Sequence, residues 1–83
     1  MKDEILRVSW IDEQGKKHPW IVVGHYDDPK HPRRKYCYQE QNPATIWFDD
    51  AENLQDVMSY LWKNVINASV IAERGITIVI EKA

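Results

Sequence analysis

The sequence predicts a two-layer α+β domain in which a mainly antiparallel sheet of four to five strands carries one long helix packed on one face. Two patterns lead to this prediction. Apolar residues alternate or cluster in short segments at residues 5–11, 20–26, 34–40, 45–48 and 76–81, which indicates strands. Only residues 49–75 repeat their apolar side chains at the helical period of about 3.6 residues. The expected order is ββββαβ, and residues 1–83 are expected to form a single α+β domain.

The helical segment has one apolar stripe and a polar face opposite to it. The stripe consists of Leu54, Val57, Met58, Leu61, Val65, Ala68 and Ala72. Asp49 or Asp50 is the expected N-cap, because a carboxylate accepts hydrogen bonds from the free N–H groups of a first turn. Gly75 suits the left-handed position that follows a last turn, so we expect one helix that reaches about Glu73.

The end of this helix has an alternative. Val70 falls on the polar side, and β-branched residues fit a helix less well than straight-chain residues do. In the alternative the helix stops early, and residues 69–72 pair as a strand with residues 76–81. With the long helix, the last strand returns antiparallel to the first, and we expect the strand order 5-1-2-3-4.

Length and composition exclude several classes of protein. A chain of 83 residues has a thin core, and 43% hydrophobic residues is ordinary for a globular protein. No apolar run approaches the roughly 18 residues of a membrane-spanning helix, and the charged N-terminal residues do not resemble a signal peptide, so no membrane is expected. Cys37 is the single cysteine and cannot form an internal disulfide, which favours the cytoplasm.

Charge is unevenly distributed although the net charge is only −2. Residues 29–38 contain four cations and no acid, whereas residues 39–60 contain five acids and no Lys or Arg. We call residues 29–36, PKHPRRKY, the basic loop. These cations, together with Tyr36 and Tyr38, suggest that the segment binds the phosphate backbone of a nucleic acid while bases stack on the tyrosine rings. The plainer interpretations are a solvated loop, or a loop that meets an acidic protein surface.

The sheet face that the helix leaves open is the second candidate surface. Whichever side of the second strand faces the helix, the other side still shows Trp20 and Tyr26, or Ile21 and Val23. An exposed aromatic patch on a small protein usually marks a partner, and a second copy of the chain is one such partner. The alternative is that Trp20 and Trp47 only cap the sheet edges or lie under the loop at residues 27–33.

Motifs for chemistry are weak. His25, His31 and Cys37 recur at six-residue intervals, which lacks the close ligand pairs that preorganise a zinc site. A mid-strand cysteine is usually a small buried hydrophobe, and the three glycines do not cluster into a phosphate-binding loop. We therefore expect no catalytic residue, no metal and no cofactor.

These observations favour a non-enzymatic small binding protein that docks on another macromolecule, most simply a protein. Such accessory or inhibitory factors are of the kind that phages and mobile elements encode. A nucleic-acid-binding module that uses residues 30–38 is the alternative, and a small enzyme built around Cys37 or the histidines ranks third. The candidate contact residues are Trp20, Tyr26, Lys30, His31, Arg33, Arg34, Lys35, Tyr36, Tyr38 and Trp47.

Overall fold

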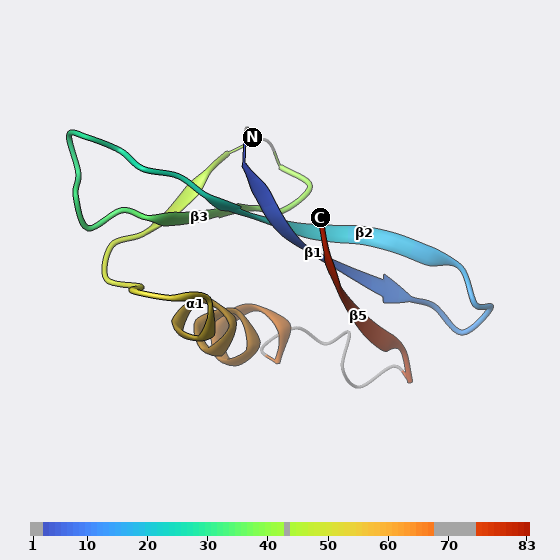
Figure 1. Cartoon of the computed structure of the whole chain (residues 1–83). Coiled ribbons are helices and arrows are strands. Elements are labelled where there is room, and N and C mark those ends of the chain that lie inside the picture. Colours follow the sequence, from blue (N-terminus) through green and yellow to red (C-terminus); the bar gives the residue numbers. More distant parts are fainter. Residues whose placement is uncertain (1–2, 43, 68–74) are drawn as a thin grey trace.

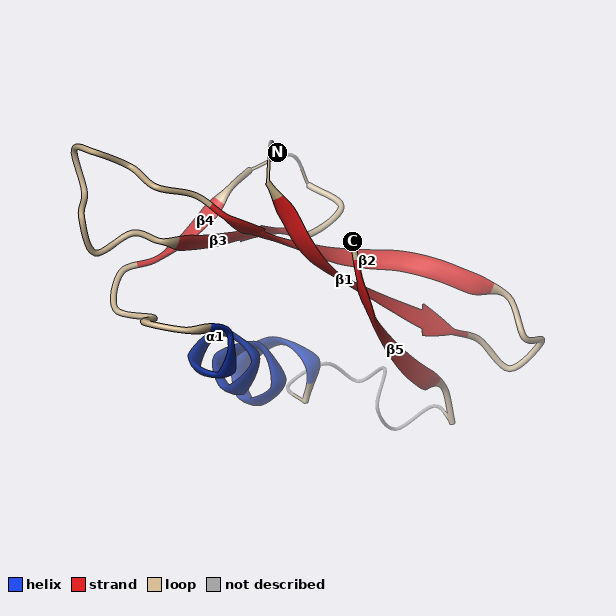
Figure 2. Cartoon of the chain, viewed as in Figure 1, coloured by secondary structure: helices blue, strands red, loops and turns tan. Residues whose placement is uncertain are grey.

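A computed structural model describes residues 3–42, 44–67 and 75–83. In this part of the chain, an antiparallel sheet of five strands lies over one helix (Figures 1 and 2). The strands are β1 (Glu4–Ile11), β2 (Lys17–His25), β3 (Tyr36–Gln39), β4 (Ile46–Phe48) and β5 (Thr77–Lys82). Helix α1 (Leu54–Leu61) continues into a π-helical segment, η1 (Trp62–Ile66). The predicted α+β fold is confirmed.

The strand order is β4-β3-β2-β1-β5, which confirms the predicted order 5-1-2-3-4. Each of the four neighbouring pairs is antiparallel. Consecutive strands are therefore neighbours from β1 to β4, and the chain returns through the helical layer to add β5 beside β1 (Figure 1). The turn between β1 and β2 contains Gly15 at φ 81°, a left-handed conformation that suits glycine.

The core lies between the sheet and the helix. Its buried members on the sheet are Leu6, Val8, Ile21, Val23, Tyr38 and Phe48, and the helical segment and its approach add Ala51, Val57, Leu61 and Ile66. The register aligns Leu6 with Val23 and Val8 with Ile21, so these four side chains share one face. The sequence left open which side of β2 meets the helix, and it is the side of Ile21 and Val23.

The start of α1 differs from the expectation. The helix begins at Leu54, four residues after Asp50, and its N-cap is Asn53. The Asn53 side chain accepts a hydrogen bond from the backbone N–H of Asp56 at 2.9 Å. The Asp56 carboxylate reaches back to the N–H of Glu52 at 3.0 Å, as in a capping box. The prediction that Asp49 or Asp50 caps the helix is therefore wrong, because the side-chain amide of Asn53, three residues after Asp50, takes that position.

The π-helical segment changes which residues reach the core. The backbone N–H of Asn67 donates to the carbonyl of Trp62, five residues earlier, at 2.8 Å. A π turn takes up one more residue than an α turn, so Ile66 follows Leu61 into the core, with 2% of its surface exposed. Val65, which the 3.6-residue period places on the stripe, is only partly buried.

Two expectations concern the chain beyond this point. The continuation of the helix to Glu73, like the alternative strand at residues 69–72, lies outside the described residues. In β5, Ile78 packs against the core as expected, whereas Ile80 keeps 44% of its surface exposed. β5 is the edge strand at the far side of the sheet from β4, and the single helix does not cover it fully (Figure 1).

Candidate docking surface

The sheet face opposite α1 carries no second layer of described residues (Figure 1). We call it the uncovered face. The register aligns Arg7 with Val22 and Val22 with Gln39, and farther along it aligns Gly24 with Cys37 and Cys37 with Trp47. These side chains alternate with the core residues of the same strands, so they point away from the helix.

Two aromatic rings shield the middle of the uncovered face. The rings of Tyr26 and Trp47 meet edge to face, with centroids 5.8 Å apart and planes at 81°. Cys37 has Trp47 as its neighbour on β4 and Gly24, which has no side chain, as its neighbour on β2. The two rings therefore cover the Cys37 side chain. Cys37 is 1% exposed, and its Sγ lies 3.9 Å from the carbonyl oxygen of Gly24. Burial raises the pKa of the Cys37 thiol, which opposes a nucleophilic role.

A hollow of about 400 Å³ lies between β1, β2 and the residues that follow β3. Its lining includes Arg7, Ser9, Pro19, Trp20, Val22 and Gln41. Trp20 Nε1 donates to Glu40 Oε1 at 3.1 Å, which holds the indole in place. Gln41 Nε2 donates to the carbonyl oxygen of Pro19 at 2.7 Å and closes one end. Trp20 lines this hollow and also packs against the core, whereas Trp47 lies beside Cys37, and both tryptophans are partly buried.

The basic loop lies against the acidic residues that follow β4. Arg34 Nε donates to Asp49 Oδ1 at 2.8 Å, and Arg33 Nη1 lies 3.6 Å from Asp50 Oδ1. The two oppositely charged segments of the sequence therefore neutralise part of each other. Lys30, His31 and Lys35 are exposed, and no ion pair to another described residue is seen for them.

The tyrosines of β3 point to the helix side. Tyr38 is 5% exposed and its ring packs 5.2 Å from that of Phe48, so it is a core residue. Tyr36 is partly buried against the core and its ring lies 4.9 Å from that of His25. Tyr38 is therefore not accessible for stacking a base beside the basic loop, and Tyr36 is only partly accessible.

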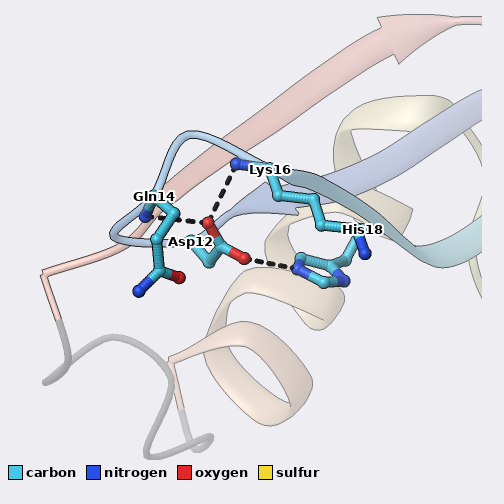
Figure 3. A network of polar contacts seen from close by, with 4 residues as sticks. All are labelled: Asp12, Gln14, Lys16 and His18. Atoms are coloured by element: carbon cyan, nitrogen blue, oxygen red, sulfur yellow. Dashed lines mark hydrogen bonds and ion pairs between the residues drawn. The ribbon is translucent and has the colours of Figure 1, made fainter.

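One polar network was not expected from the sequence (Figure 3). Asp12 Oδ1 accepts hydrogen bonds from the backbone N–H groups of Gln14 and Lys16, each at 2.9 Å. Its Oδ2 lies 2.8 Å from His18 Nε2, and the His18 ring stacks on Trp10 with centroids 4.1 Å apart. The bond to His18, followed by the one from Lys16, lowers the pKa of Asp12. The turn that follows Asp12 can be predicted from the sequence. The contact between Asp12 and His18 cannot, because it depends on the strand register.

His25 and Cys37, two members of the weak set that was considered for a metal or a nucleophile, are not brought together. His25 lies on the helix side with Tyr36, whereas Cys37 lies on the uncovered face. In residues 3–42, 44–67 and 75–83, no group of three or more His, Cys, Asp or Glu side chains is placed to share a metal ion. None of the described helices has the length and hydropathy to cross a membrane.

Comparison with family models, curated proteins and solved structures finds no match to this chain. The function is therefore inferred from the surface itself.

Proposed function

We propose that this is a non-enzymatic binding protein that docks on another protein through the uncovered face. The observation that carries the proposal is the unequal cover of the sheet: α1 packs on one face (Figure 1), and the rings of Tyr26 and Trp47 meet on the other. Tyr26 is 38% exposed. Trp and Tyr are the residue types that dominate binding hot spots, because rigid rings bury a large area at a small entropic cost.

Charge favours a protein partner over a nucleic acid. Arg33 and Arg34 already have carboxylate partners in Asp50 and Asp49, and the net charge of the chain is −2. A dedicated nucleic-acid binder usually carries a strongly basic face. The remaining loop cations, Lys30 and Lys35, lie at the rim, where charges act mainly on the rate of encounter with an acidic partner.

The proposal also names a cellular compartment and the kind of factor to which the protein belongs. We propose an accessory or inhibitory factor of the cytoplasm, of the kind that phages and mobile elements encode, because Cys37 has no cysteine partner within the chain. A second copy of the chain is the simplest competing occupant of the uncovered face, since an apolar patch can be self-complementary.

An affinity capture from cell lysate tests the proposal. The bait is the full chain, and the lysate is compared with and without nuclease treatment. We expect a protein partner that survives nuclease, and whose complex is weakened by more than about 1–2 kcal/mol in Trp47→Ala. Trp62→Ala is the matched control, because Trp62 is 50% exposed on the helical layer. Capture of nucleic acid that Trp47→Ala leaves unchanged would overturn the proposal.

A further inference from the structure

A second apolar surface lies on the helix side of the sheet, between β4 and the first turns of α1. It is a groove of about 420 Å³. Phe48 forms part of its lining at 8% exposure, while Ile46 and Tyr60 stand at its sides at 42% and 47% exposure. The ring of Tyr60 meets that of Phe48 edge to face, with centroids 5.3 Å apart and planes at 89°. The groove therefore has an apolar floor between two exposed apolar side chains.

This groove follows a free strand edge. β4 is the last strand on its side of the sheet, and it pairs only with β3 among the described residues. All three β4 residues, Ile46–Phe48, line the groove, although alternate side chains of a strand point to opposite faces. The main chain of an edge strand offers unpaired N–H and C=O groups, which a further strand can pair with.

The charged side chains that line the groove are all acidic. Its charged lining residues are Asp49, Asp50 and Asp56, and no Lys or Arg lines it. Arg34 and Arg33 pair with the first two of these acids, the second pair being highly exposed and 3.6 Å long. The Asp56 carboxylate receives a backbone hydrogen bond from Glu52 and has no ion pair with a described residue. A basic side chain at this end would meet an uncompensated carboxylate.

We propose that the β4 edge and this groove bind an extended, basic and apolar peptide segment of a partner protein. The segment adds to the sheet beside β4, places one apolar side chain between Ile46 and Tyr60, and directs a Lys or Arg toward Asp56. This surface lies on the helix side of the sheet and shares Trp47 with the uncovered face, and its recognition combines main-chain pairing with a charge preference. The shortness of β4 limits the paired part of the segment to about three or four residues.

A defined peptide tests this proposal. The probe is a fluorescein-labelled heptapeptide of alternating valine and threonine with a lysine at each end, added to the full chain at low salt. We expect saturable binding and shifts of the backbone amide signals of Ile46–Phe48 in NMR spectra. Ile46→Thr and Tyr60→Ala should each weaken binding about tenfold, as expected for central contacts of an interface. Trp62→Ala, on the same helical layer but outside the groove lining, should leave the dissociation constant unchanged.

Two altered peptides separate the components of recognition. Replacing both lysines with glutamate should weaken binding, with a smaller difference at high salt because salt screens exposed charges. Methylating the backbone nitrogens of the valines and threonines alike should abolish binding, because whichever edge of the peptide faces β4 then lacks its N–H groups. No binding up to about millimolar peptide overturns the proposal, as does equal binding of the glutamate or N-methyl peptide. A concentration-dependent dimer that buries Ile46 and excludes the peptide would assign the edge to a second copy instead.

Discussion

Arg34 donates from its Nε to Asp49 Oδ1 across 2.8 Å, and this bond ties the β2–β3 loop to the segment that leads from β4 into α1. The Arg34 side chain is 35% exposed and that of Asp49 is 67% exposed, so water screens much of the attraction. We expect a double-mutant cycle of Arg34→Gln and Asp49→Asn to give a coupling energy of about 0.2–1 kcal/mol. Urea unfolding of the four proteins measures it. A coupling above about 2 kcal/mol would mean that the pair is less solvated than it appears.

The same pairing limits how the basic loop can act on nucleic acid. Four free cations on a duplex would give a log–log salt slope near −3 to −4, at about 0.9 counterion per phosphate contact. With Arg33 and Arg34 engaged by acids, we expect weak binding with a slope near −2, from Lys30 and Lys35. Fluorescence anisotropy with a labelled 20-base-pair duplex across a salt series measures the slope. Tight binding with a slope of −4 would revive the nucleic-acid alternative.

Leu61→Ala should be among the most destabilising single changes. Leu61 is fully buried between the sheet and the helix, at the point where α1 passes into η1. Truncation leaves a cavity in a thin core, and such changes cost about 2–5 kcal/mol. The control is Trp62→Ala, the next residue, which is 50% exposed and should change stability by about 0.5 kcal/mol or less. Equal melting temperatures for wild type and Leu61→Ala would show that the core assignment is wrong.

The fold was predictable because its signals are local. Alternation in the strands and the 3.6-residue stripe of Val57 and Leu61 both follow from one buried face per element. The strand order followed because consecutive antiparallel strands tend to be neighbours. The sequence did not predict the π turn, which buries Ile66 and leaves Val65 only partly buried against the core. A periodic pattern assumes constant residues per turn, and one inserted residue shifts every later side chain.

The candidate site was predictable only in part. An uncovered sheet face followed from having one helix, and Trp47 with Tyr26 does lie on that face. The sequence did not show that Tyr38 turns into the core, because a strand rich in aromatic residues on one face fits either direction. Nor did it show that Arg34 meets Asp49, since this contact joins residues 15 positions apart through the sheet register.

The hairpin carboxylate Asp12 should make stability depend on pH in the acid range. Its hydrogen bonds from His18 and from the Lys16 backbone lower its pKa in the folded protein below the usual value of about 3.9. The stabilisation is therefore complete above the unfolded pKa and is lost as pH falls through the folded pKa. Asp12→Asn should remove that part of the pH dependence. The measurements are urea unfolding from pH 2 to 7 and NMR titration of the carboxyl carbon, and an Asp12 pKa at or above 3.9 would contradict the prediction.

The last prediction uses Cys37 as a reporter of the uncovered face. The thiolate is the reactive form of cysteine, so a buried thiol with a raised pKa should react slowly with a disulfide reagent. At pH 8 we expect the native protein to react at least about tenfold more slowly than the urea-unfolded chain, because reaction requires the cover to open. Trp47→Ala removes the ring beside Cys37 and should speed the reaction of the folded protein, whereas Trp62→Ala should not. Circular dichroism shows that each variant is folded under the assay conditions. A native rate equal to the unfolded rate would mean that Trp47 and Tyr26 do not cover the thiol, and the uncovered face would then need a different arrangement of its aromatic side chains.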